Sequence, residues 1–194
     1  MIIPDRLYRT GNSDFMKRFV KEGEILFRPL SYYRAIEDKS RADQFEGIHA
    51  IDASKAKLEI LDPTSGEMEA TFELIGNLEY GNPQVQNIHI VCFSDQPQKQ
   101  IGHTTVEIFD VKAMLDRIAA GLGKIGLQLS CEAVRYYASE PLSNLPEVGL
   151  SWLYKRECFS EQKEFRLGFH CDDAKLMPIA AKAFGSFEEF ARIL

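Results

Sequence analysis

The segment "NIHIVCFS" (residues 87–94) is the most apolar of the strands that the sequence predicts. β-Branched and aromatic side chains dominate it, as is typical of strands. Because its apolar residues follow one another with little polar interruption, the strand is predicted to be buried on both faces. We therefore expect residues 87–94 to form the centre of a sheet.

The segment "SEQKEFRLGFH" (residues 160–170) predicts a second strand, in which side chains alternate from Gln162 onward. One side is apolar and predicts a core face, formed by Phe165, Leu167, Phe169 and Cys171. The other side carries polar and charged groups, namely Gln162, Glu164, Arg166 and His170. The alternation leaves open whether this second face is solvated or lines a site.

The rest of the chain adds more strands than helices. Further strands are expected at residues 6–10, 24–30, 48–54, 56–62, 67–80, 104–110 and 125–137, with a turn at 63–66. Helices are expected from Ser13 to about Lys21, from 111 to 121 behind an Asp110 cap, around 148–156 and at 186–194, with short helical turns in 31–47. Strands and helices do not alternate regularly, so the sequence predicts one α+β domain over residues 1–194 with a mainly antiparallel or mixed sheet.

The composition is that of an ordinary globular protein, with 194 residues, 45% of them hydrophobic and 27% charged. No segment approaches the roughly 18 continuous apolar residues of a membrane span, and the start of the chain lacks a signal-peptide pattern. Four scattered cysteines are typical of reduced thiols. We therefore expect a cytoplasmic protein with no membrane contact. The net charge of -6 disfavours nonspecific binding to nucleic acid but allows an anionic ligand held by a few arginines.

Two motifs favour structural interpretations over cofactor sites. The sequence "GLGKIG" (residues 121–126) has the G-x-G-x-x-G spacing, but it follows a predicted helix and precedes a strand. A dinucleotide site needs the reverse order, so this motif predicts a helix end and a turn. The four histidines lack the pair spacing of zinc ligands, and we expect neither folding nor activity to need a metal.

One alternative interpretation of the sequence requires a metal ion. The acidic segment 37–46 and the "EQK" triplet, Glu161 to Lys163, together suggest a magnesium-dependent nuclease. Nuclease chemistry needs the acid and the lysine on one strand face beside an upstream acid. By alternation, Glu161 and Lys163 share the face that continues as the core, so the pair fits only at the start of the strand.

Four segments resemble a large group of uncharacterised bacterial and phage proteins. The segments are "LYR" (7–9), "GEILFRPLSYYRAIED" (23–38), "VCFS" (91–94) and "KRECFSEQKEFR" (155–166). The last of them matches the pattern K-x-x-x-F-x-x-E/Q-x-E-F/Y-R. The order and spacing cover most of the chain, but this resemblance implies little about function.

A second, more distant resemblance is to mono-ADP-ribosyltransferases. Arg9, then Ser31-Tyr32-Tyr33, then Gln162-x-Glu164 follow the order of that family's motifs, although "LSYY" departs from the S-T-S triplet common in its arginine-first class. The resemblance implies an ADP-ribosyltransferase-like fold, NAD as substrate, and an enzyme of bacterial toxin or phage-defence type. The acceptor, a protein or a nucleic acid, stays open.

The same resemblance implies a role for each residue. Glu164 would accept a hydrogen bond from the ribose 2′-hydroxyl, Gln162 would orient the acceptor, and Arg9 would pair with the NAD phosphates. Tyr32 or Tyr33 would stack on nicotinamide, and Ser31 would also contact NAD. Convergence of Arg9, one of these tyrosines and Glu164 favours the transferase. Convergence of Glu161, Lys163 and an upstream acid favours the nuclease, and convergence of neither set favours a non-catalytic binding module.

Overall fold

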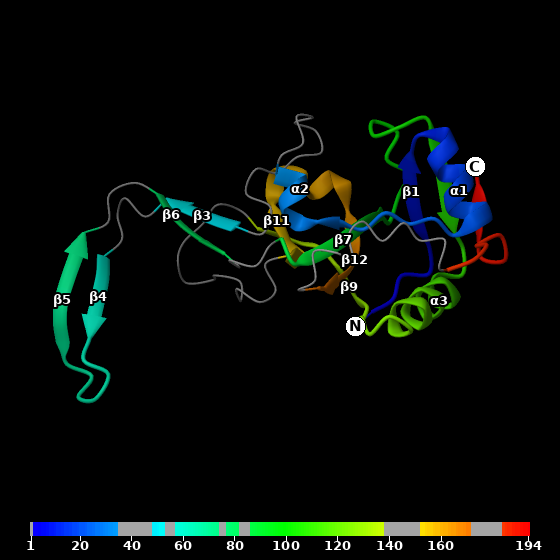
Figure 1. Cartoon of the computed structure of the whole chain (residues 1–194). Coiled ribbons are helices and arrows are strands. Elements are labelled where there is room, and N and C mark those ends of the chain that lie inside the picture. The colour runs from blue at the N-terminus through cyan, green and yellow to red at the C-terminus, as the bar shows by residue number, and fades with distance from the viewer. Residues whose placement is uncertain are drawn as a thin grey trace.

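A seven-stranded sheet forms the body of the protein (Figure 1). The structure, a computed structural model, describes residues 2–34, 48–52, 57–73, 77–81, 86–137, 152–171 and 184–194. The sheet runs in the order β13-β8-β1-β7-β12-β9, with β2 beside β7. Its strands are β1 (Leu7–Gly11), β2 (Arg28–Pro29), β7 (Ile88–Ser94), β8 (Thr104–Ile108), β9 (Ser130–Ala133), β12 (Glu164–His170) and β13 (Ala191–Ile193). All its pairings are antiparallel, which confirms the predicted α+β class and mainly antiparallel sheet.

Strand β7 lies at the centre of this sheet, as predicted for residues 87–94. Its two faces join different apolar clusters. Val91 and Phe93 belong to the large core, whereas Ile88 and Ile90 pack with Trp152 in a smaller cluster. Seven consecutive residue pairs join β7 to β12, from Glu164↔Ser94 to His170↔Ile88.

The opposite edge of β7 is shared by two strands that diverge from each other. β1 meets β7 at the pair Tyr8↔Ser94, and β2 meets it at Arg28↔Ile90 and Pro29↔His89. Within the described residues, no ladder pair joins β7 to either strand between these two points. The sheet therefore forks over the middle of β7.

The helices are short and end on clear signals. α1 (Ser13–Glu22) is capped by Asn12, whose side chain accepts a bond from the Asp14 amide, rather than by Ser13 as predicted. It ends at Gly23 in the left-handed region (φ 67), where a Cβ would collide with the backbone of Gly185. α3 (Val111–Gly123) begins at the predicted Asp110 cap. α2 (Leu30–Arg34) and a 3₁₀ helix, η3 (Glu157–Gln162), flank the fork.

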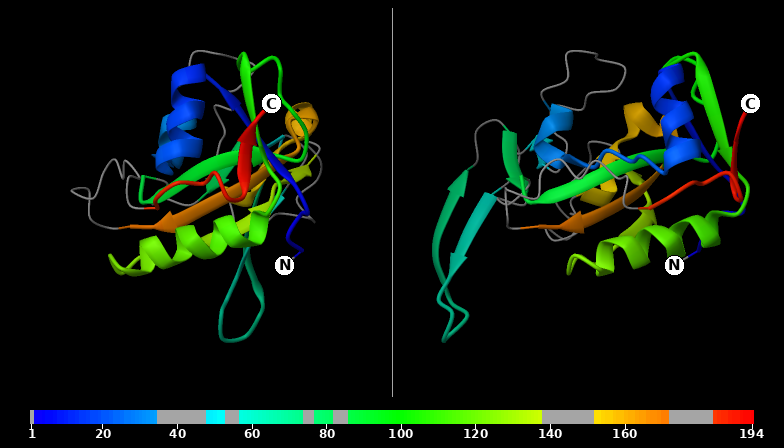
Figure 2. Two further views of the ribbon diagram at one scale, coloured as in Figure 1. Left: turned by 90° about the vertical axis from the view of Figure 1, so that its right-hand side faces the viewer. Right: turned by 45° about the vertical axis from the view of Figure 1, so that its right-hand side comes forward.

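Two hairpins lie outside the sheet. β3 (Ile48–Asp52) pairs with β6 (Asn77–Gly81), and β4 (Lys57–Leu61) pairs with β5 (Met68–Glu73). In Figures 1 and 2 they extend in succession away from the body. The single long strand predicted over 67–80 is therefore wrong, because β5 and β6 have different partners.

Four other predicted elements also differ. Residues 186–194 form a turn and then β13 instead of an amphipathic helix, because β13 pairs with the edge of β8 while Phe187 and Phe190 are still buried. The predicted strand 125–137 splits into β9 and β10 (Arg135–Tyr137), and part of the predicted helix 148–156 is β11 (Tyr154–Arg156), which pairs parallel with β10. In 24–30, only Arg28–Pro29 forms a strand.

The apolar face of β12 is buried as predicted, and it yields a stability test. Leu167 is fully buried in the core, so Leu167→Ala should lower the free energy of unfolding by about 2–5 kcal/mol. Urea unfolding measures this loss, with Leu61→Ala on the exposed β4 as a control expected to change it by less than about 0.5 kcal/mol. A loss below about 1 kcal/mol for Leu167→Ala would contradict the core position.

Candidate functional site

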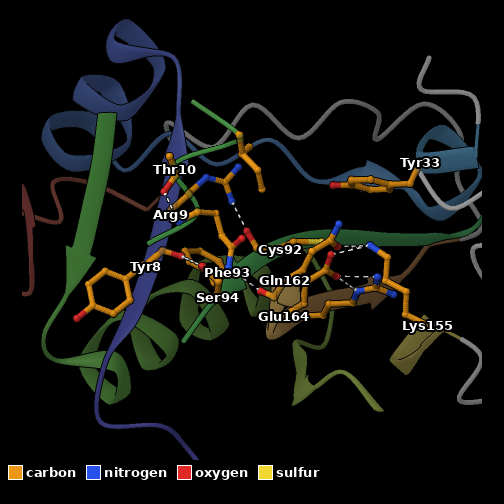
Figure 3. A pocket seen from close by; sticks show the side chains of 13 residues that line it. Tyr8, Arg9, Thr10, Tyr33, Cys92, Phe93, Ser94, Lys155, Gln162 and Glu164 are labelled. Atoms are coloured by element: carbon orange, nitrogen blue, oxygen red, sulfur yellow. Dashed lines mark hydrogen bonds and ion pairs between the residues drawn. The ribbon is translucent and has the colours of Figure 1, made fainter. Parts of the chain in front are cut away.

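A cavity of about 120 Å³ opens in the fork of the sheet (Figure 3). Strands β1, β7 and β12 supply part of its wall, while α2, β11, η3 and the loop after β7 supply the rest. Its lining includes the chemically active side chains of Arg9, Tyr33, Cys92, Gln98, Lys155, Gln162, Glu164 and Arg166. Sheet register explains part of this gathering, because Glu164 and Arg166 lie opposite Ser94 and Cys92 and therefore face the same side.

Glu164 is the centre of a buried ion network. Its carboxylate accepts bonds from Lys155 Nζ at 2.7 Å and from Arg166 Nε and Nη2 at 2.9 and 2.7 Å. The side chains of Lys155 and Arg166 are 2% and 1% exposed, whereas that of Glu164 is 10% exposed and lies on the cavity wall. The network therefore presents a carboxylate backed by two buried cations.

This network keeps Glu164 ionised. Burial alone would raise the pKa of its carboxyl group, but the charges of Arg166 and Lys155 outweigh burial and lower the pKa to about 2. Nearby, burial raises the pKa of the Tyr33 hydroxyl well above its usual value, so this tyrosine stays neutral. At neutral pH the cavity thus offers an anionic acceptor beside a neutral aromatic ring.

Lys155 links Glu164 to Gln162. Its ammonium group donates to Gln162 Oε1 at 2.6 Å as well as to Glu164, and it lies 4.9 Å from the ring centroid of Phe159. One lysine on β11 therefore sets the positions of both members of the predicted Gln-x-Glu pair.

Arg9 reaches the cavity from β1, on the far side from Lys155 (Figure 3). Its guanidinium lies among the rings of Phe15, Phe19 and Phe93, 5.2 to 5.8 Å from their centroids. It also donates to the carbonyl of Cys92 at 3.2 Å, in the gap between β1 and β2. Arg9 thus lines the same cavity as Glu164, while Tyr8 is half-buried and its hydroxyl lies 3.5 Å from Glu107.

The loop after β7 holds the cavity's rim in place. The buried side-chain amide of Gln98 donates hydrogen bonds to the carbonyls of Glu161 and Gln162, at 3.3 and 3.1 Å. Its backbone N–H donates to the Thr10 hydroxyl. Sequence reasoning missed Gln98, because nothing in its surroundings along the chain distinguishes it from an exposed loop amide.

The structure brings together only part of the predicted set. Tyr33 lines the cavity, whereas Ser31 and Tyr32 are absent from its lining, and Tyr32 is 42% exposed against Arg28. Gln162 lines the cavity too, but it is the last residue of η3 and not a strand residue. The strand begins only at Glu164, since Lys163 adopts the left-handed conformation (φ 43).

The nuclease residues do not line this cavity. Glu161 and Lys163 are exposed and lie before β12, so they share no strand face, and the acidic segment 37–46 lies outside the described residues. Among the residues that the structure describes, no group of three or more His, Cys, Asp or Glu side chains could hold a metal ion. The "GLGKIG" motif ends α3 and forms a turn, as predicted.

Lys155, which sequence reasoning did not assign to the site, and Arg166, which it placed only on the polar strand face, belong to one sequence pattern. In "KRECFSEQKEFR", the pattern positions are Lys155, Phe159, Gln162, Glu164, Phe165 and Arg166. All of these except Phe165 contact at least one of the others through the ion network or the ring of Phe159. The signal for Lys155 and Arg166 was their membership in that pattern.

No helix in the described part of the chain is long and apolar enough to cross a membrane. Comparison of the chain with protein-family models, with curated proteins and with solved structures gave no match.

Proposed function

We propose that this protein binds NAD⁺ with its nicotinamide ribose in the fork cavity and transfers the ADP-ribosyl group to an acceptor. One observation carries the proposal. Arg9, Tyr33, Gln162 and Glu164 come from separate elements and line one cavity. The resemblance to mono-ADP-ribosyltransferases implies the same set of groups.

The chemistry suits these groups. The bond between ribose C1′ and the nicotinamide nitrogen breaks, and its electron pair leaves with nicotinamide, which becomes neutral. Positive charge develops on the ribose, and the ionised Glu164 would stabilise it through the 2′-hydroxyl. An acceptor lone pair then bonds C1′ as the acceptor loses its proton, and Gln162 would orient that acceptor.

The size and charge of the cavity favour one end of a dinucleotide. A cavity of about 120 Å³ is smaller than the roughly 300–1,000 Å³ of most ligand pockets, so it suits one ring with the rest of the ligand outside. Among the described residues that line it, three cationic side chains stand against one carboxylate: Arg9, Lys155 and Arg166 against Glu164. This excess of positive charge favours phosphate groups at its mouth.

The direct test uses NAD⁺ labelled in the nicotinamide ring and, separately, in the adenine. Release of labelled nicotinamide reports cleavage, and adenine label retained on protein or nucleic acid from cell extract reports transfer. Both are expected for the wild-type protein, and both should be absent without it. No release of the nicotinamide label and no retention of the adenine label, together with no NAD⁺ binding by calorimetry, would contradict the proposal.

A second candidate is a non-catalytic binding module. The ion pairs of Glu164 with two buried cations favour this candidate. In a binding module, the carboxylate would position these cations for an anionic ligand and would take no part in a reaction. NAD⁺ binding without nicotinamide release would select this candidate.

Arg9 gives a prediction about ligand binding. Both Arg9→Lys and Arg9→Ala should weaken NAD⁺ binding by about tenfold or more, because lysine keeps the charge but loses the planar fork that pairs with phosphate. Calorimetric titration measures the dissociation constant, with Arg18→Lys at an exposed surface pair as the matched control. Unchanged affinity in both Arg9 variants would remove Arg9 from the site.

A further inference from the structure

The β4–β5 hairpin, residues 57–73, projects away from the body and is called the arm below (Figures 1 and 2). Within the described residues, its two strands pair only with each other. Both outer edges therefore carry backbone amide and carbonyl groups without a strand partner in that part of the chain. An isolated two-stranded hairpin is only marginally stable in water, so its free surfaces favour a partner.

The arm concentrates exposed apolar side chains. Ile60, Leu61, Met68 and Phe72 are between 42% and 59% exposed. From the ladder register, Ile60 and Phe72 lie on one face, while Leu61 and Met68 lie together near the turn. Single exposed apolar residues are common, but four within one hairpin indicate an interaction surface.

The arm is also strongly acidic. It carries five carboxylates, Glu59, Asp62, Glu67, Glu69 and Glu73, against the single cation Lys57. Backbone bonds from Ser65 and Thr64 lower the pKa of the Asp62 carboxyl group, which keeps it charged. Nucleic acid, anionic lipid and a second copy of the arm would all be repelled by this charge, so a basic protein surface is its best complement.

We propose that the arm docks a protein partner by adding an extended basic segment to its edge. Glu59 lies on the face opposite to Ile60 and Phe72. A strand added at the edge would continue both faces, so the partner segment should alternate Lys or Arg with apolar residues. Backbone bonds would supply part of the affinity, and the side-chain alternation would supply the selectivity.

The experiment uses the full chain and two fluorescent ten-residue peptides, one alternating lysine with valine and the other alternating glutamate with valine. Fluorescence anisotropy should show the lysine peptide binding at least tenfold more tightly than the glutamate peptide. Phe72→Ser and Glu59→Lys should each weaken binding of the lysine peptide several-fold. The matched controls Ile125→Ser and Glu22→Lys, at exposed positions away from the arm, should leave it unchanged.

The experiment distinguishes the proposed partner of the arm from other binding partners. Equal binding of the two peptides, or binding that neither arm variant weakens, would overturn the proposal. A dimer in sedimentation that Phe72→Ser dissociates would assign the arm to a second copy instead. Binding to phosphatidylserine vesicles that the same variant abolishes would assign it to a membrane. None of these readouts involves NAD⁺, so the arm and the cavity can fail independently.

Discussion

Glu164→Gln is expected to lower NAD⁺ cleavage by about 100-fold or more while NAD⁺ affinity changes less than about threefold. Glutamine keeps the size of the side chain and an oxygen acceptor but removes the negative charge. That charge matters most when positive charge develops on the ribose, so its loss falls on the transition state rather than on the bound substrate. Nicotinamide release gives the rate, and calorimetry gives the affinity.

The ion network complicates this substitution in a measurable way. Removing the charge leaves Lys155 and Arg166 buried with reduced compensation, and breaking a buried pair costs about 3–5 kcal/mol. Rates must therefore be referred to folded protein, determined from circular dichroism under the assay conditions. Glu132→Gln is the matched control, since this carboxylate on β9 pairs with Arg135 but lies outside the cavity lining. Full activity in folded Glu164→Gln would refute the catalytic role.

The sequence predicted the centre of the fold well because its signals there are local. Continuous apolar residues located β7, and alternation identified Phe165, Leu167 and Phe169 as the core face of β12. Such patterns reflect burial directly, since a strand's two faces are set by alternation alone. The Asp110 cap of α3 was predictable because a helix cap is also a local signal, read from residues next to one another in the chain.

The wrong predictions concern segments whose structure is determined by contacts with residues far away in the chain. Alternation placed Gln162 on the strand with Glu164, but the left-handed Lys163 separates η3 from β12. Gln162 still reaches the cavity, because Lys155 and Gln98 hold it there from other elements. The C-terminal segment has helical spacing of its phenylalanines, yet the open edge of β8 captures Ala191–Ile193 as a strand.

The cavity itself was beyond the reach of any local pattern. It exists because β1 and β2 meet the same edge of β7 at different points. That arrangement depends on register between segments far apart in the chain. Alternation also could not show that the polar face of β12 is covered, and Arg166 is among the most buried side chains of the protein.

Lys155→Met is expected to lower the free energy of unfolding by about 3 kcal/mol at pH 7, because it removes one of two buried cations that compensate Glu164. Methionine fills a similar volume, so lost packing contributes little. Urea unfolding measures the change. The matched control Lys112→Met breaks an exposed pair with Asp116 on α3 and should cost at most about 0.5 kcal/mol.

The pH dependence separates this electrostatic cost from a packing defect. The pKa of Glu164 is lowered to about 2 in the folded protein, so its ionised form stabilises the fold above its unfolded pKa of about 4.3. That stabilisation is lost as pH falls from about 4.3 toward 2. Without Lys155, only Arg166 remains to oppose the effect of burial, so the pKa of Glu164 should rise.

The difference in stability between wild type and Lys155→Met should therefore be largest near pH 7 and shrink as pH falls below about 4, where the carboxyl group becomes protonated in the variant. Urea unfolding at pH 7, 5 and 3.5 tests this course. A difference that stays the same at all three pH values would mean that Lys155 stabilises the fold through contacts that do not depend on the charge of Glu164. Its charge would then not be what holds Glu164 ionised at the cavity wall.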